Sequence, residues 1–275
     1  MEENGGTKEE TPDITAPKAT QAKNFLAPLT IFSFILSLPV LALVIWLLYM
    51  KDYDCEILLR LPRLRIGIGI WMIFVFLISN AVVFCRSRFP MPGLVAVMVP
   101  LLVMLIMGLA LVGVSRTESR AIPASPMWLK LKIHDNNNWN NIKSCIYDTH
   151  ICDDLVSRTS SLKSYDFSLK KLSSIESGCC KPPTSCVMEY VNATFWEKEE
   201  DEATDKSYPY DRDCESWNND QSRLCYNCYS CRQGFLTTLQ RKWTRLGIFL
   251  VVMAILLVIA HLLLFVATMW ERYKD

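Results

Sequence analysis

The chain has 275 residues, and its 29 basic and 28 acidic side chains leave a net charge of +1. A nucleic-acid-binding protein needs a basic surface to neutralise phosphates, so this balance argues against that class of partner. Hydrophobic residues make up 51% of the chain and are gathered into long uncharged stretches. Eleven cysteines are many for a cytosolic protein and indicate an oxidising compartment.

Four stretches lack Asp, Glu, Lys and Arg, and in the last of them, 246–270, the only ionisable side chain is that of His261. A helix needs about 20 apolar residues to cross the hydrocarbon core of a bilayer, and each stretch is that long. The alternatives are a buried core helix or one interfacial segment, and both are disfavoured by the length without charge. We predict transmembrane helices at 25–50, 66–85, 93–115 and 246–268.

Residues 1–24, before the first span, contain almost no large apolar side chains, so we predict a disordered tail. The first span is too long for a signal peptide, and no small-residue cleavage site follows Tyr49, which indicates an uncleaved anchor. Segments 51–65 and 86–92 are short connections, and 269–275 is a short tail. Residues 116–245 are numerous enough for a small folded domain.

The orientation in the membrane is predicted mainly from cysteine chemistry. Counting Lys and Arg beside the spans gives six against four, which is a weak indication. Nine cysteines and the only Asn-x-Ser/Thr sequon, at Asn192, lie in 116–245, and disulfides and N-glycans form on the lumenal side. We therefore predict that 51–65 and 116–245 are extracellular, that both termini and 86–92 are cytosolic, and that Asn192 is glycosylated.

Cys55 raises the number of extracellular cysteines to ten, an even number that allows all of them to be paired. Cys85 is left alone at the cytosolic end of the second span, beside Arg86 and Arg88. An acyl chain attached there could return to the bilayer, so we predict S-acylation of Cys85.

Few polar groups lie inside the predicted spans. Asn80 and His261 are the strongest of them, and an isolated group of this kind is more often a packing contact than part of a proton path. The absence of any carboxylate in the four stretches argues against a pump or an ion-coupled transporter.

The most informative motif is Gly-Cys-Cys-Lys-Pro-Pro-Thr-Ser-Cys at 178–186. Gly178 suits a helix end that needs a positive φ, and the two prolines prevent the helix from resuming. Two adjacent cysteines cannot readily bond each other, so Cys179 and Cys180 should tie one helix end to two different segments. Residues at helical spacing predict the preceding helix: Leu162, Tyr165, Leu169, Leu172 and Glu176.

This doublet, in the large loop of a four-span protein, resembles the signature of the tetraspanin family, and the version with Lys-Pro-Pro resembles its plant branch. Further matches are Trp139 to Cys145, Asp213-Cys214 and the Cys-x-x-Cys-x-x-Cys run of 225–231. Leu36-Ser-Leu-Pro39 resembles the family's proline-bearing first span. The likeness covers residues 25 to 270. It implies an all-α membrane protein with four transmembrane helices and a disulfide-rich, mostly helical large extracellular loop.

The resemblance also implies two disulfides, Cys180 with Cys186 and Cys179 with Cys231. The six other candidates are even in number, but the sequence does not give their partners: Cys55, Cys145, Cys152, Cys214, Cys225 and Cys228. The run of 225–231 could alternatively be a zinc or iron–sulfur fragment or a redox-active pair. Those metal sites need thiolates in a reducing compartment and a fourth ligand, so we predict disulfides and no metal or cofactor.

The chain carries no phosphate-binding glycine loop and no hydrolase or metalloprotease motif, so we predict that it is not an enzyme. The resemblance implies a membrane scaffold that organises client proteins and other tetraspanins, in homo- or hetero-oligomers, at the plasma membrane or an endomembrane. It also implies links to cell differentiation and development. A membrane lipid between the four helices, with sterol as the candidate, is a further partner compatible with this function and with the alternative below. The alternative is a cell-surface receptor or co-receptor whose large loop binds an extracellular ligand.

Overall fold

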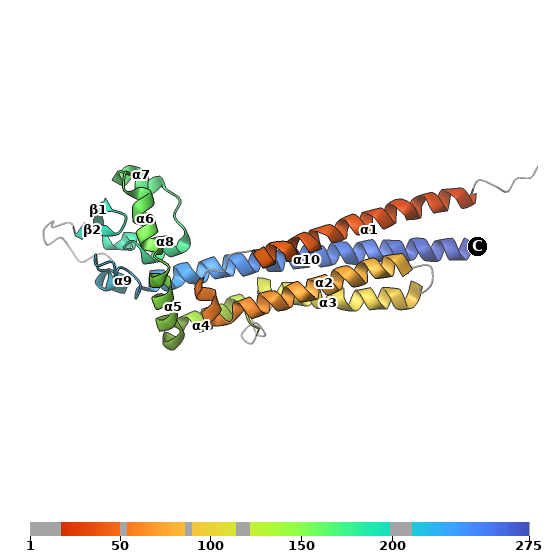
Figure 1. Cartoon of the computed structure of the whole chain (residues 1–275), viewed down its shortest axis with the longest axis horizontal. Helices are drawn as coiled ribbons and strands as arrows, with labels where there is room; N and C mark the ends of the chain where they lie inside the picture. Colours follow the sequence, from red (N-terminus) through yellow and green to blue (C-terminus); the bar gives the residue numbers. More distant parts are fainter. Residues whose placement is uncertain (1–17, 50–53, 86–89, 114–121, 199–210, 275) are drawn as a thin grey trace, which may run out of the picture.

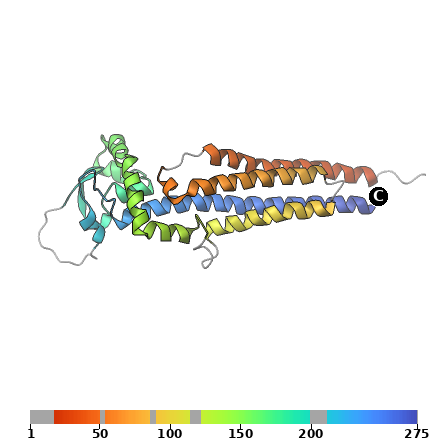
Figure 2. The same cartoon turned by 60° about the horizontal axis from the view of Figure 1, so that its bottom comes forward.

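The computed structural model describes residues 18–49, 54–85, 90–113, 122–198 and 211–274. Four long helices lie side by side, and a smaller group of helices and strands is gathered at one end of them (Figure 1). We call this smaller group, residues 122–198 and 211–228, the loop domain. The start of α1 and the end of α10 lie together at the opposite end (Figure 2).

Each of the four long helices has the length and apolar composition needed to cross a membrane. Helix α3 packs along α10, α1 contacts both α2 and α10, and α2 contacts α3. The fold class is therefore an all-helical membrane bundle with a disulfide-bonded loop domain. The bounds are α1 (Lys18–Tyr49), α2 (Leu61–Cys85), α3 (Pro90–Val112) and α10 (Tyr229–Lys274).

These helices extend beyond the uncharged stretches of the sequence. Helix α1 begins at Lys18, in place of a disordered tail through residue 24, and α2 begins at Leu61 rather than Ile66. Helix α10 includes the last 17 residues of the segment predicted as loop, and it continues through most of the predicted C-terminal tail. Hydropathy marks only the part of a helix that lies in lipid, whereas the backbone hydrogen bonds can continue into water. The predictions for residues 1–17 and for Arg86 and Arg88 lie outside the described residues.

Helices α3 and α10 approach each other at backbone distance. A Cβ atom added to Gly108 would lie 2.9 Å from the carbonyl oxygen of Gly247, and one added to Gly247 would lie 2.8 Å from that of Gly108. Without a hydrophobic driving force in lipid, transmembrane helices associate largely through such close packing of small residues. This pair of glycines therefore fixes α3 tightly on α10.

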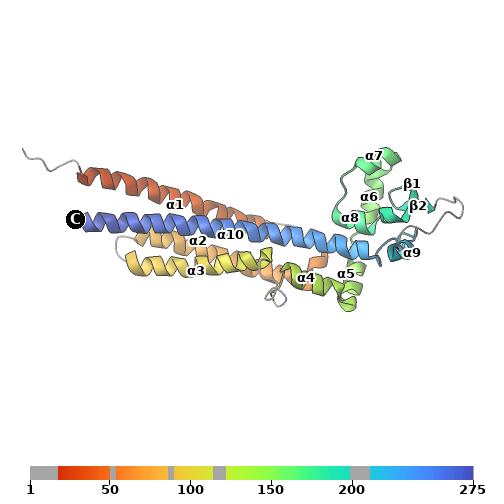
Figure 3. The same ribbon diagram turned by 180° about the vertical axis from the view of Figure 1, so that it is seen from behind.

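The loop domain is built around the outer part of α10, with α4 following α3 along the same helix (Figure 3). Its helices are α4 (Pro126–His134), α5 (Asn136–Asp148), α6 (Ile151–Thr159), α7 (Ser164–Leu169), α8 (Ser174–Cys179) and α9 (Arg212–Ser216). Short 3₁₀ helices η1 (Asp54–Leu59) and η2 (Thr184–Cys186) and an antiparallel hairpin of β1 (Met188–Asn192) and β2 (Phe195–Lys198) complete the described elements.

Helix α5 shows how the sequence builds this domain. The Asp135 side chain accepts the Asn138 N–H and caps the helix, satisfying a donor that would otherwise be unpaired. Trp139, Ile142 and Ile146 recur at i, i+3 and i+7 and form its buried face. The Trp139 ring meets the edge of Phe235 on α10, so this face is packed against the long helix.

The hairpin is a finding that helical patterning did not predict. Its residues alternate, so that Tyr190 and Trp196 are paired across the strands and turn toward α7. There they form an aromatic cluster with the buried Phe167 ring. Val191 and Phe195 are left exposed on the outer face. Alternation of this kind is typical of a half-buried strand.

The helix predicted before the cysteine doublet is two helices. Helix α7 ends at Leu169, and α8 begins after Ser173 with a reciprocal capping box to Glu176. Gly178 does not have the positive φ that we predicted. It lies within α8, where an added Cβ would be 2.3 Å from the Ser230 carbonyl oxygen. The absence of a side chain is thus needed for the close approach of α8 to α10.

We predict that Gly178→Ala destabilises the loop domain, because the clash is with backbone atoms that cannot rotate away. Overpacking of this kind costs about 1–3 kcal/mol in free energy of unfolding. Gly67→Ala on α2 is the matched control, since an added Cβ there meets nothing within 4 Å. Thermal unfolding and protease resistance of the full-length protein measure the effect, and equal values for the two variants would contradict the prediction.

Candidate functional site

The end of α8 is the centre of the disulfide framework. Cys179 is the last residue of the helix and Cys180 its C-cap, so the two side chains are turned about 100° apart around the axis. Cys179 bonds Cys231 on α10, with 4.4 Å between the Cα atoms, as the resemblance implies. Cys180 bonds Cys152 on α6, with 5.2 Å between the Cα atoms. One helix end is thus joined to two other helices.

The implied bond between Cys180 and Cys186 is wrong in this structure. Helix α6 packs against α8 and brings Cys152 to Cys180. After the two prolines, η2 contacts α9, and Cys186 bonds Cys214 there. The family resemblance implied a local bridge over six residues, whereas the packing of helices far apart in sequence decides the partners.

The Cys-x-x-Cys-x-x-Cys run does not converge on one point. Cys225 bonds Cys228, while Cys231 belongs to the bridge from α8. The fifth pair is Cys55 with Cys145, which joins η1 to α5 across 90 residues of sequence. All ten predicted disulfide cysteines are therefore paired, and Cys85 is the free cysteine of the chain.

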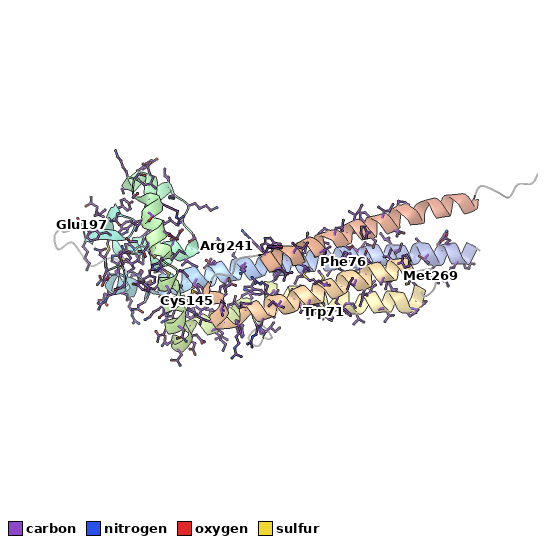
Figure 4. The ribbon with its side chains drawn as sticks, viewed as in Figure 1. Trp71, Phe76, Cys145, Glu197, Arg241 and Met269 are labelled. Carbon is purple, nitrogen blue, oxygen red and sulfur yellow. A yellow bond between two sulfur atoms is a disulfide. The ribbon has the colours of Figure 1, made fainter. Side chains whose placement is uncertain are left out.

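A covalent bond and an ion pair at neighbouring residues attach the loop domain to the bundle. Next to Cys55, the carboxylate of Glu56 is 2% exposed and accepts hydrogen bonds from Lys242 Nζ at 2.7 and 2.8 Å. Removing one partner from a buried ion pair costs about 3–5 kcal/mol. Figure 4 places Cys145 where α5 meets the outer end of the bundle. The domain is therefore held both on α10 and on the connection between α1 and α2.

A second ion pair lies inside the loop domain. The Arg158 guanidinium donates to the buried Glu176 carboxylate, which also accepts the Ser173 N–H. Burial alone would raise the pKa of Glu176, but the hydrogen bonds from Ser173 and Arg158 together lower the pKa below its ordinary value. The negative charge is thus part of the folded structure, where it joins α6 to the start of α8.

Carboxylates also organise the start of α10. Asp213 accepts the backbone N–H groups of Tyr229 and Ser230, each at 2.7 Å, and so satisfies two donors at the N-terminus of the long helix. Asp211 caps α9 and accepts the Ser185 hydroxyl, and these hydrogen bonds lower its pKa. Both carboxylates are therefore engaged within the protein.

The polar groups inside the bundle contact one another. His261 Nε2 lies 3.1 Å from Ser79 Oγ, and its Nδ1 lies 2.8 Å from the Leu257 carbonyl oxygen. Since a carbonyl oxygen only accepts, the shorter contact is an Nδ1–H donated to Leu257, and the Ser79 hydroxyl and carbonyl oxygen both lie at Nε2. Asn80 donates to Ser37 Oγ at 3.2 Å. These contacts join α2 to α10 and to α1, which is the packing role predicted for Asn80 and His261.

The two predicted modification sites lie at opposite ends of the molecule. Asn192 is exposed where β1 turns into β2, and its Oδ1 accepts the Thr194 N–H. Cys85 is exposed at the last residue of α2. Their positions are accessible, and the modifications themselves stay predictions.

Comparison with known proteins gives one consistent result. The model of the Tetraspanin family matches residues 22–270. Tetraspanin-15 of Arabidopsis thaliana is 48% identical over 90% of this chain and 80% of its own length. Tetraspanin-2 and Tetraspanin-8 of the same organism are 32% and 29% identical, over 86% and 87% of this chain and 89% and 90% of their own lengths. No solved structure shows significant similarity to the chain.

We predict that the two bridges reaching residues 225–231 differ in importance. The bond between Cys179 and Cys231 spans 52 residues, and that between Cys225 and Cys228 spans three. Loop-closure entropy then assigns about 4 kcal/mol to the first bridge and about 2 kcal/mol to the second.

The comparison uses double Cys→Ser variants, so that neither leaves an unpaired thiol. All four sulfurs are fully buried, which makes the pairs well matched in the cost of introducing serine. Denaturant unfolding and delivery to the cell surface measure the difference. Equal loss from both double variants would contradict this ranking.

Proposed function

The chain belongs to the tetraspanin family, and from this premise we propose that it is a membrane scaffold that binds client proteins and other tetraspanins laterally. Family membership over residues 22–270 is the observation that carries the proposal. Proteins of this family generally associate with other membrane proteins and are in general not enzymes. We propose the same of this chain, with a contribution to cell differentiation or development.

The protein is an integral, multi-pass membrane protein. We propose that the loop domain is extracellular and both termini are cytosolic, at the plasma membrane or an endomembrane. Support comes from five disulfides, all at one end of the bundle, because disulfides persist in oxidising compartments. The start of α1 and the end of α10 lie together at the other end (Figure 2).

The outer face of the hairpin is the partner surface that we propose. Val191 and Phe195 expose apolar side chains there, while Tyr190 and Trp196 hold the opposite face on α7. The hairpin lies at the end of the loop domain that is remote from the bundle, where Glu197 is labelled (Figure 4). Side chains on this face can change without loss of the aromatic cluster, which suits a surface that selects partners.

A membrane lipid is the second kind of partner in the proposal, with sterol as the candidate. Ser33 on α1 is 2% exposed, and its hydroxyl has no hydrogen-bond partner in the described residues. A buried hydroxyl without a partner is costly, and the hydroxyl of a sterol could supply one. Sterol content of the purified protein, compared between wild type and Ser33→Ala, tests this: equal content would argue against the assignment.

We expect several membrane proteins, other tetraspanins among them, to co-purify with this chain in mild detergent. Val191→Ser combined with Phe195→Ser should change that set while leaving the bundle intact. Tyr165→Ser on α7 is the control, since Tyr165 is exposed and apolar but lies outside the hairpin. Quantitative mass spectrometry is the measurement. Recovery of one soluble extracellular protein instead would support the receptor alternative.

Cys85 should carry an acyl chain, because it is exposed at the end of α2 and is the only cysteine outside the disulfides. With other thiols blocked, acyl exchange should label wild type and not Cys85→Ser. Labelling of both to the same extent would refute the acylation.

Asn192 should carry an N-glycan, because its side chain is exposed at a hairpin turn of the proposed extracellular domain. Enzymatic removal of N-glycans should increase the gel mobility of wild type to that of Asn192→Gln. If the two proteins migrate together before treatment, the site is unoccupied.

A further inference from the structure

A polar groove lies in the loop domain, where α8, α9 and the first turns of α10 meet. Its volume is about 890 Å³, near the upper end of the range of roughly 300–1,000 Å³ for ligand sites. Neither the disulfides nor the partner surface of the hairpin occupies it. Hydroxyl and amide side chains dominate its walls, among them Ser174, Ser177, Asn227, Gln233 and Thr237.

The charged side chains that line the groove differ in whether they are already engaged in hydrogen bonds within the protein. Asp211 and Asp213 are both engaged in caps, so their oxygens are already supplied with donors. Lys181 and Arg212 also line the groove, and neither side chain has an ion pair or hydrogen bond to any residue that the structure describes. The groove therefore presents two available cations, together with two carboxylates that keep their negative charge but already accept hydrogen bonds from the protein.

A third cation at the groove is held in the protein. Arg232 donates to Asn136 Oδ1 at 3.1 Å, and its guanidinium lies 5.3 Å from the centre of the Trp139 ring. It adds positive potential but is fixed by its own contacts. The available donors are those of Lys181 and Arg212.

An aromatic ring completes the set. Tyr229 lines the groove and is 57% exposed, with its ring edge against His134. A flat aromatic side chain beside hydroxyls and amides offers both a stacking surface and hydrogen bonds to a ligand rich in hydroxyl groups. Cations beside them select an anionic form of that ligand.

Peptide ligands fit the groove less well. Addition of a strand needs a free sheet edge, and neither β1 nor β2 lines the groove. Docking of an amphipathic helix needs a row of apolar anchor sites, whereas the groove-lining side chains are mostly polar. Recognition of an acidic peptide by cations alone is the remaining peptide mode, and it would make no use of the ring or the hydroxyls.

We propose that this groove binds an acidic oligosaccharide, with Lys181 and Arg212 pairing with its carboxylates and Tyr229 stacking on a sugar ring. The volume accommodates more than one sugar unit. This binding activity goes beyond the scaffold role and does not depend on it. It would attach the loop domain to carboxylated polysaccharide outside the membrane.

The test uses the full-length protein in detergent or nanodiscs and a linear trimer of galacturonic acid as the probe. Calorimetry should show binding that weakens at high salt, since exposed charge pairs are screened. Lys181→Gln and Arg212→Gln should each weaken it about tenfold, the loss expected for one charge-assisted hydrogen bond. Both variants should unfold at the wild-type temperature, because the two side chains make no ion pair or hydrogen bond to the described part of the chain.

Lys163→Gln removes one exposed positive charge from the same domain outside the groove, and its affinity should equal that of wild type. Maltotriose, a neutral trimer, should bind at least tenfold more weakly. Equal affinity for maltotriose, or no effect of either groove variant, would overturn the assignment. Binding of hexaglutamate with the same affinity and the same dependence on Lys181 and Arg212 would replace the sugar by an acidic peptide.

Discussion

The loop domain depends on α10 leaving the membrane without a break. Because α10 is continuous from Tyr229 to Lys274, its outer part is a rigid support on which the shorter helices assemble. Three residues in its first two turns contact other elements of the loop domain. Cys231 forms a disulfide with Cys179, the backbone of α8 approaches Gly234, and Phe235 packs against the ring of Trp139. Short helices of six to nine residues are marginal alone, so they owe their order to this support and to the disulfides.

The sequence was sufficient for the bundle and insufficient for the connections within the loop domain. A long uncharged segment predicts a transmembrane helix, because the transfer of that segment into lipid depends on its own residues. Disulfide partners are not local, and Cys186 is six residues from Cys180 yet bonds Cys214 on another element. Two local signals in the sequence do mark elements of the loop domain. Ser173 and Glu176 have the spacing of a capping box, and the alternation around Asn192 is that of a hairpin.

Polar contacts between elements occur in two places, inside the bundle and at its outer end. Inside the bundle, Ser79 with His261 and Asn80 with Ser37 join helices through neutral hydrogen bonds, which are tolerated in lipid when both partners are present. At the outer end, Glu56 and Lys242 form a charged contact, with side chains that are 2% and 14% exposed. None of the three contacts followed from the sequence, because each joins residues on different helices whose facing surfaces are set by packing.

The length of α10 outside the uncharged stretch has a mechanical consequence. Residues 229–245 extend the helix by about 25 Å, so the outer end acts as a lever arm. A change of about 10° in helix tilt, within the range that membranes of different thickness impose, would carry that end sideways by about 4 Å. Since Cys55 also fixes the domain to the connection between α1 and α2, the arm cannot move independently of the other spans. Bilayer thickness would then influence the position at which the loop domain contacts neighbouring proteins.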